Sequence, residues 1–263
     1  MHGTVSITFD DGLASIYSLA LPELERVGAT ATVFVISDLV GKKFLGQPVT
    51  SGRMLRSLSS KGWEIASHTR THPNLTELSD IRANAELRDS KARLEDIVSA
   101  DVVSLAYPFG AYDARIKAIA ARHYTFARSG SSYPPLRVNN VCPPDPMELK
   151  AVNTYEHAYF LPLHLFENYI ARNIGHRPKP KPRNPNLDHA RINSSRKALE
   201  ARFVRKWLRK LRSNQWLILT LHDISTQKSP TSYSIPIKEF REIVKAIAQS
   251  AEIVNLGEGA QSA

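Results

Sequence analysis

Two adjacent aspartates follow an apolar segment near the start of the chain. Residues Thr4–Phe9 have the β-branched and aromatic composition of a buried strand, and Asp10, Asp11 and Gly12 come directly after it. Two carboxylates this close repel each other, and one of them usually needs a cation or a proton beside it. The pair therefore indicates a site that holds positive charge where the strand ends.

A second polar cluster, residues 68–73 with the sequence HTRTHP, follows the predicted strand 63–67. It supplies His68 and His72, whose spacing lets both rings face one ligand in a helical or turn-like backbone. Two imidazoles and one carboxylate can form a metal site that keeps positions open for water and substrate. One aspartate would complete this triad and the other would remain beside it as a base. The residues alone leave open which aspartate does which.

Two more predicted strands end in side chains that can do chemistry. One runs into residues 106–110 (AYPFG), which contain Tyr107, and a late strand runs into His222. In repeated β-α folds the carboxyl ends of the parallel strands carry the chemistry. Each short motif is common by itself, but their positions at the ends of several strands predict one shared rim.

Segments typical of strands alternate with segments typical of helices along the chain. Strands are predicted at residues 4–9, 30–36, 63–67, 102–107, 124–129, 216–221 and 252–256, and helices at residues 14–28, 54–62, 79–98, 113–123, 194–213 and 237–250. Ser79 is in position to cap the third of these helices. Repeated β-α units predict an α/β fold with a mostly parallel sheet, open or closed into a barrel.

The composition excludes several classes of protein. A single cysteine, Cys142, excludes an internal disulfide, and no apolar run approaches the length of a membrane span. The first strand begins about at Thr4, which leaves no room for a signal peptide. We therefore expect a cytoplasmic protein, unless a leader has been removed.

The positive charge of the chain is concentrated in one segment. The net charge is +10, and residues 172–212 contain 14 of the 35 Lys and Arg residues against two acidic ones. Within the predicted helix 194–213, four apolar residues recur every four positions and would face the core: Leu199, Phe203, Trp207 and Leu211. We expect either a barrel helix with a solvated basic side or a surface for an anionic glycan, a lipid-linked sugar phosphate or an acidic membrane. No nucleic-acid recognition motif accompanies the charge, so we expect no nucleic-acid partner.

The sequence resembles the polysaccharide deacetylases of the NodB-homology type, carbohydrate esterase family 4. The first motif of that family, TFDDG, is present whole at residues 8–12, and the second, H-S/T-x-x-H-P, is present whole at residues 68–73. The third, normally R-x-P-F/Y-G, corresponds to residues 106–110, and the fifth, normally L-x-H, corresponds to residues 220–222. The resemblance covers residues 4 to about 129 and resumes at residue 216.

The resemblance implies an irregular (β/α) barrel of about seven parallel strands with outer helices. A single catalytic domain would span residues 1–263, with a basic insertion-like segment at about residues 130–213. The implied activity is that of a metal-dependent hydrolase. It would remove an N-acetyl or other N-acyl group from an amino sugar in a poly- or oligosaccharide or a lipid-linked glycan. The implied cofactor is one divalent metal ion, zinc in the first place, with cobalt, nickel or manganese as alternatives.

The resemblance also implies a role for each residue of the first, second and fifth motifs. Asp11, His68 and His72 would bind the metal, Asp10 would be the general base, and His222 would be the general acid. These roles agree with elementary chemistry. A metal lowers the pKa of bound water, a carboxylate can take the proton as that water attacks an acetamide, and an imidazole can protonate the leaving amine.

The third motif would contact the substrate through Tyr107, Pro108 and Phe109. The backbone N–H after the proline, that of Phe109, would help to stabilise the oxyanion. The arginine that opens this motif in the family normally helps to hold the base, and Ala106 stands there in this chain. Arg128, at the end of the next predicted strand, could reach the same carboxylate from another side.

Two further departures from the family concern the fourth and fifth motifs. The aspartate-tryptophan element that tunes the acid histidine is not recognisable. Asp145 and Asp188 are the only aspartates between Arg128 and His222. Thr220 stands where the fifth motif has leucine, which would make the acetyl pocket less apolar.

Two alternatives to a deacetylase remain. Another enzyme with two histidines and a carboxylate, such as an iron oxygenase, would use the same ligands. The parallel β-α pattern and the paired aspartates argue against it. The second alternative is a catalytically impaired relative of the same fold that binds a glycan or a membrane. The missing third-motif arginine leaves that open.

Overall fold

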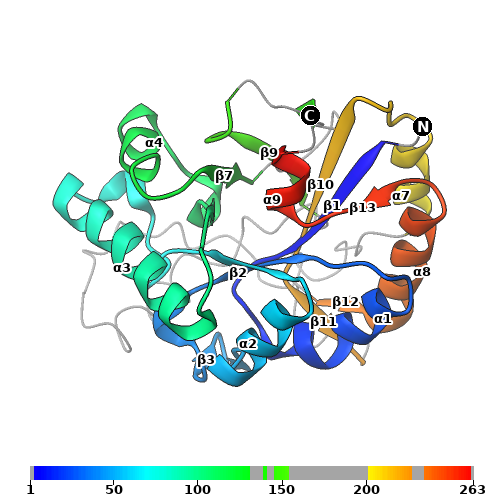
Figure 1. Cartoon of the computed structure of the whole chain (residues 1–263), viewed down its shortest axis with the longest axis horizontal. Helices are drawn as coiled ribbons and strands as arrows, with labels where there is room; N and C mark the ends of the chain where they lie inside the picture. The colour runs from blue at the N-terminus through cyan, green and yellow to red at the C-terminus, as the bar shows by residue number, and fades with distance from the viewer. Residues whose placement is uncertain (1–2, 131–138, 141–144, 154–200, 227–233, 262–263) are drawn as a thin grey trace, which may run out of the picture.

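Seven parallel strands form a closed barrel that is surrounded by helices (Figure 1). The computed structural model describes residues 3–130, 139–140, 145–153, 201–226 and 234–261. The barrel strands are β1 Thr4–Phe9, β2 Thr32–Val35, β5 Glu64–Ser67, β6 Ser104–Ala106, β7 Phe126–Ser129, β9 Leu149–Asn153 and β10 Gln215–Leu221. β1 pairs with β10 along its whole length and so closes the sheet. The predicted (β/α) barrel is confirmed.

The barrel is irregular because β1 has two partners on one side. β2 pairs only with Thr8 and Phe9 at the end of β1, whereas β13 Glu252–Ile253 pairs with Thr4 and Val5 at its start. β8 Asn139–Asn140 adds a short antiparallel partner to β10. Two further pairs of short strands lie outside the barrel: β3 Lys43–Phe44 with β4 Gln47–Pro48, and β11 Asp223–Ser225 with β12 Ser234–Pro236.

Helices cover the outside of the barrel (Figure 1). They are α1 Leu21–Glu25, α2 Gly52–Ser60, α3 Asp80–Val98, α4 Ala114–Ala120, α7 Ala201–Leu208, α8 Ile237–Ala248 and α9 Leu256–Gln261, with shorter helical segments at η1 Ile16–Ala20, η2 Ser37–Leu39, η3 Leu75–Glu77 and η4 Pro108–Gly110. The predicted helix 14–28 is divided into the wide turn η1 and α1, which has Pro22 in its first turn. Ser79 occupies the N-cap position of α3, although its side chain makes no capping hydrogen bond. Within the described residues, no helix is both long and apolar enough to cross a membrane.

The predicted strands agree with the structure except at β9 and at residues 252–256. The first six lie within two residues of β1, β2, β5, β6, β7 and β10. β9 was not predicted, although it belongs to the barrel. The predicted strand 252–256 is only β13, because Leu256 already begins α9.

α7 packs differently from the prediction. Its buried residues are Ala201, Val204 and Leu208, whereas Phe203 is 41% exposed. The predicted apolar stripe is therefore wrong at Phe203, because the helix turns the face that carries Val204 and Leu208 toward its neighbours. Trp207 and Leu211 are partly buried against the core. Most of the basic segment lies outside the described residues, as do Leu199, Cys142 and Asp188.

The C-terminal helix α9 closes the amino end of the barrel. Gly257 donates its N–H to the carboxylate of Glu64 (2.9 Å), which also accepts from the hydroxyl of Thr32 (2.8 Å). Gly259 lies so close to the indole of Trp216, inside the barrel, that a Cβ atom there would be 2.7 Å from the ring. Since this end is filled, the carboxyl end of the strands is the place left for a site.

Candidate active site

The two aspartates lie at the carboxyl end of β1. The N–H of Asp10 donates to the carbonyl of Leu221 (2.9 Å), which extends the β1–β10 ladder by one residue. Asp11 and Gly12 both have φ of 66°, so the chain turns sharply in the left-handed region. Thr50 fixes this turn, because its N–H and its hydroxyl both donate to the carbonyl of Gly12 (2.8 and 2.9 Å). The turn separates the two carboxylates, which contact different partners.

The two histidines named from the sequence converge on Asp11. Nε2 of His68 and Nε2 of His72 each lie 3.7 Å from Oδ1 of Asp11 and 3.1 Å from each other. Nδ1 of His68 lies 2.9 Å from the carbonyl oxygen of Ala106. Because a carbonyl can only accept, Nδ1 carries the hydrogen, and the lone pair of the neutral ring is on Nε2. The first ligand atom is thus oriented by a neighbouring strand.

The protonation of these three groups fits a bound cation. Burial is the main cause that lowers the pKa of His68 to about 4 and the pKa of His72 well below its usual range. Burial, and then the charge of Asp10, raise the pKa of Asp11 well above the usual value of a carboxyl. A divalent ion would stabilise a buried carboxylate beside two neutral imidazoles. In the described part of the chain, these three residues are the group whose ligand atoms, within 4.8 Å of one another, could hold a metal ion.

Asp10 is held by Arg128. Nη2 of Arg128 donates to both carboxylate oxygens of Asp10 (2.5 and 2.7 Å), and the guanidinium lies over the ring of Phe34 (4.9 Å). Burial alone would raise the pKa of Asp10. The charges of Arg128, His68 and His222 outweigh burial, and the pKa is lowered overall. The pKa of Asp10 is therefore shifted in the direction opposite to that of Asp11.

Arg128 reaches Asp10 from the strand next to the third motif. Arg128 in β7 is the register partner of Ala106 in β6. The arginine thus stands on the neighbouring strand, directly beside the position where the family pattern has it. Both residues are buried. The geometry agrees with the expectation that Arg128 could reach this carboxylate. Its role in orienting a base stays a prediction.

His222 directly follows β10 and lies near Asp10. Nε2 of His222 is 4.0 Å from Oδ2 of Asp10, and burial is the main cause that lowers the pKa of the imidazole. The next residue, Asp223, is buried and accepts hydrogen bonds from the hydroxyls of Ser15 (2.6 Å) and Ser234. These bonds fix the chain beside the histidine.

The third motif divides between the interior and the rim. The N–H of Tyr107 donates to the carbonyl of Arg128 (3.0 Å), and its hydroxyl donates to the carbonyl of Met147 (3.1 Å). Both donors of Tyr107 therefore form hydrogen bonds within the protein, and the contact of this residue with substrate stays a prediction. Pro108 is buried. Phe109 has φ of 61° and is 41% exposed, and its ring meets that of His72 edge-on at 4.8 Å.

Other residues complete the surroundings of the site. The ring of Phe44, from the β3–β4 hairpin, also packs near the His72 ring (5.6 Å between centroids), and no sequence motif marks it. The hydroxyl of Thr220 lies 3.4 Å from that of Thr8 inside the barrel, so it has a hydrogen-bond partner within the protein. Asp145 is one of the two aspartates that could replace the aspartate of the missing fourth motif. It accepts a hydrogen bond from Nζ of Lys117 (2.6 Å).

The family model for polysaccharide deacetylases matches residues 2–126, the part of the chain that carries the paired aspartates and both histidines. The chain is 33% identical over 109 residues to the protein YxkH of Bacillus subtilis (strain 168), covering 41% of this chain and 38% of that one. It is 30% identical over 116 residues to Chitin deacetylase 1 of Cryptococcus neoformans, covering 44% of this chain and 23% of that one. The alignments thus span less than two fifths of either relative.

A solved structure shares the fold over nearly the whole chain. It is that of a carbohydrate esterase family 4 pseudoenzyme from Bacillus anthracis, with a TM-score of 0.58 and 16% identity, covering 99% of this chain and 66% of that one. With the barrel and the matched motifs, these comparisons show that residues 2–126 are similar to the polysaccharide deacetylases and that the chain shares the fold of a carbohydrate esterase family 4 protein.

Proposed function

We propose that this protein is a divalent-metal-dependent hydrolase that removes an N-acetyl group from an amino sugar of a glycan. The arrangement around Asp10 carries the proposal. This ionised carboxylate is fixed by Arg128 and stands beside the converging ligand atoms of Asp11, His68 and His72. A bound divalent ion would supply the Lewis acidity that lowers the pKa of a water molecule and polarises a carbonyl. A relative named as a chitin deacetylase supports an acetylated amino sugar as the substrate class.

Asp10 would accept the proton of the attacking water. Its lowered pKa makes it a weak base, so it needs a water molecule whose own pKa is lowered. The two hydrogen bonds from Arg128 keep both oxygens in one orientation while the proton moves. The ion pair between Arg128 and Asp10 would thus hold the carboxylate of the base in one orientation.

His222 would give the proton to the leaving amine. Its lowered pKa leaves the free imidazole neutral, so it must gain a proton within the complex. The carboxyl of Asp10, once protonated, lies 4.0 Å away and is more acidic than an imidazolium. We therefore propose that one proton passes from water to Asp10, then to His222, and then to the nitrogen that leaves. The N–H of Phe109 as an oxyanion donor stays a prediction.

Acetate release from N-acetylated glycans tests this function. The protein would be stripped with a chelator, reloaded with zinc, cobalt, nickel or manganese, and incubated with chitin oligomers and peptidoglycan fragments. We expect acetate only from the reloaded samples. Bound metal without acetate from any glycan would instead favour the catalytically impaired glycan- or membrane-binding relative. Iron-dependent consumption of oxygen would favour the oxygenase.

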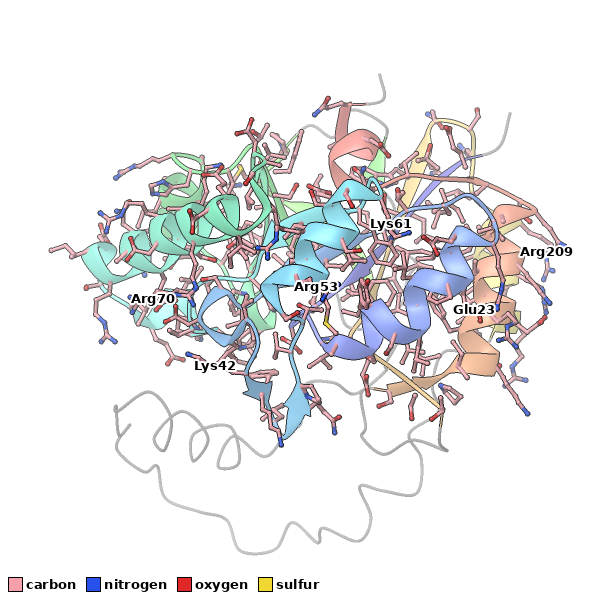
Figure 2. All side chains as sticks on the ribbon, turned by 60° about the horizontal axis from the view of Figure 1, so that its bottom comes forward. Glu23, Lys42, Arg53, Lys61, Arg70 and Arg209 are labelled. Carbon is pink, nitrogen blue, oxygen red and sulfur yellow. The ribbon has the colours of Figure 1, made fainter. Side chains whose placement is uncertain are left out.

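We also propose that the described part of the basic segment holds an anionic partner away from the active site. In α7 and the residues after it, Arg205 pairs with Glu242 (3.3 Å), whereas Lys206, Arg209 and Lys210 form no ion pair with a described residue. These side chains are exposed, and Arg209 lies at the outer edge of the molecule in Figure 2. Phosphate or carboxylate groups of a glycan or of a membrane surface would complement them.

A further inference from the structure

We infer that helix α3 positions the two metal-binding histidines: Glu86 and Ser90 on its buried face hold residues 68–72, called here the histidine loop, in the shape that brings His68 and His72 together. The inference rests on the proposed metal site. It concerns two residues that lie outside every motif that identifies the family.

The buried face of α3 contains two polar residues that packing does not explain. The buried residues of this helix are Ala83, Glu86, Leu87, Ser90 and Leu94. Glu86 is 8% exposed and Ser90 is fully buried. A carboxylate in such a place is unfavourable unless it accepts hydrogen bonds. Positions 86 and 90 are four apart, so both side chains leave the helix on the same side, one turn from each other.

Glu86 contacts the histidine loop directly, and Ser90 contacts Ser67, the residue before the loop. The N–H of Thr71 donates to Oε2 of Glu86 (2.9 Å), and its hydroxyl donates to Oε1 (2.8 Å). The hydroxyl of Ser90 lies 2.8 Å from that of Ser67, which in turn accepts from the N–H of Thr69 (3.2 Å). The helix therefore holds the loop at two points, one before each histidine.

The loop needs such support because its backbone is strained. Thr69 has φ of 65° and His72 has φ of 64°, in a region that residues with a Cβ atom rarely adopt and that is least favourable for a β-branched residue. The hydroxyl of Thr69 accepts from the N–H of His72 (3.0 Å), a bond that exists only in this bent shape. A strained shape persists only where its surroundings over-determine it.

The histidine loop also forms backbone hydrogen bonds with η2. The N–H of Ser37 donates to the carbonyl of Thr69 (3.2 Å), and the N–H of Asp38 donates to the carbonyl of Arg70 (3.0 Å). Arg70 itself lies 3.7 Å from the carboxylate of Glu86 and 3.7 Å from that of Asp38. The loop thus lies between η2 and α3. Glu86 supplies the α3 contacts nearest to His72, whose ring must face Asp11 before a metal can bind all three ligands.

The affinity for zinc tests this positioning role. We expect Glu86→Ala to bind zinc about 10-fold more weakly than the wild type in competition with a chelator, by analogy with residues that orient metal ligands. Glu95→Ala is the matched control. Glu95 also lies on α3 and accepts a backbone N–H, that of Val102 (3.1 Å), but it is nine positions from Glu86, about 13 Å along the helix. Its loss should lower thermal stability without changing the affinity for zinc.

A milder variant keeps the test informative if Glu86→Ala does not fold. Thr71→Val removes one of the two donors to Glu86 while keeping the shape of the side chain, and it should weaken zinc binding several-fold. Glu86→Gln keeps an acceptor for the N–H of Thr71 and should restore most of the affinity. Hydrogen exchange at the amides of Thr71 and His72, measured without metal, should be faster in Glu86→Ala than in Glu95→Ala.

The outcomes separate this inference from the proposed function. Wild-type protein that binds no divalent metal would refute the metal site, and the hydrogen-exchange comparison would still report on the loop. Wild-type affinity and wild-type exchange in folded Glu86→Ala or Thr71→Val would overturn the positioning role and leave the metal site intact. An equal loss of affinity in the Glu95→Ala control would show a general effect of destabilising α3 and would also overturn it.

Discussion

Asp10 and Asp11 are neighbours in the chain, yet their surroundings change their pKa values in opposite directions. Arg128 and two histidines hold the pKa of Asp10 low, whereas burial and the charge of Asp10 raise that of Asp11. Two carboxyl groups with separated pKa values typically have different parts in one mechanism. At the scale of single residues, the structure therefore gives the two aspartates different surroundings, which supports the proposed division into a base and a metal ligand.

Substituting each aspartate tests this separation. We expect Asp10→Asn to keep its metal and lose activity by roughly 10²–10⁴-fold, because only the proton acceptor is removed. Asp11→Asn should lose most of the metal itself, because a ligand is removed. Metal content by elemental analysis and acetate release would be measured on the same samples. Equal metal loss in both variants would show that the two roles have not been distinguished.

The sequence predicted the site residues better than the contacts between them. The motifs at residues 8–12 and 68–73 named the three residues whose side chains converge, because strand ends of a parallel barrel meet at one rim. The contact of Arg128 with Asp10 depends on the register of β6 and β7, which no local pattern encodes. The exposure of Phe203 and the bonds of Glu86 likewise depend on how helices are rotated in the folded chain.

At the scale of elements, the arginine stands on β7 and not at the Ala106 position of β6, and this difference from the family pattern can be tested directly. Ala106 and Arg128 are register partners on adjacent strands and both are buried. We expect Arg128→Ala to lower turnover by at least 10-fold, because Asp10 loses its orienting partner. Adding Ala106→Arg should restore part of that loss, since the new guanidinium would start one strand away, as in the family pattern. Ala106→Arg alone should be destabilised, because two arginines would compete for one buried space. A double variant that folds but is no more active than Arg128→Ala would contradict this account.

Helices α1 and α8 are joined by an ion pair whose effect should depend on pH. Hydrogen bonds from Arg241 (2.8 and 2.9 Å) are the main cause that lowers the pKa of Glu23 to about 2. A carboxyl whose pKa is lower in the folded state stabilises the protein above its unfolded pKa, about 4.3, and loses that contribution as the pH falls toward 2. Figure 2 shows Glu23 on the outer helices of the barrel.

We therefore expect Glu23→Gln to be less stable than the wild type by about 1 kcal/mol at pH 6, a modest value because Arg241 is partly exposed. The difference should vanish near pH 2. Urea unfolding at pH 6, 4 and 2.5 measures it. Glu25→Gln, on the same helix, is the control, because its partner Lys61 and Glu25 itself are both half-exposed. A difference between wild type and Glu23→Gln that is unchanged at low pH would argue against this ion pair.

The elements show why local patterns were only partly sufficient. β1 and β10 have long apolar runs and were predicted closely. β9 has the sequence LKAVN, follows a proline-rich stretch and becomes a strand only because β7 and β10 lie on either side of it. β13 and α9 are formed by residues 252–261, in which the apolar residues have no strong periodicity. Strands that depend on distant partners are those that the sequence pattern does not reveal.

At the scale of the whole molecule, the basic surface after residue 201 should act separately from the active site. We expect the charge reversals Lys206→Glu, Arg209→Glu and Lys210→Glu to raise the apparent KM for an anionic glycan and to leave turnover at saturation nearly unchanged. Added salt should have the same effect, since exposed charges are screened over about 10 Å at 0.1 M. A short neutral oligosaccharide should respond to neither. Binding of vesicles of anionic lipid would be measured on the same variants. If the charge reversals change neither the KM for the anionic glycan nor the binding of the vesicles, α7 is only a helix with a solvated basic side.

The closure of the barrel has a consequence for the order in which the protein can be made. β1 leaves the ribosome before its partner β10, which is more than 200 positions later in the chain. Until β10 is synthesised, β1 and β9 both lack the partner that closes the barrel, and such open edges pair readily with other chains. The last ladder bond, from Asp10 to Leu221, joins the proposed base to the late strand. The nascent chain therefore carries the ligand motifs early but completes its site late, and it depends on protection from aggregation in between.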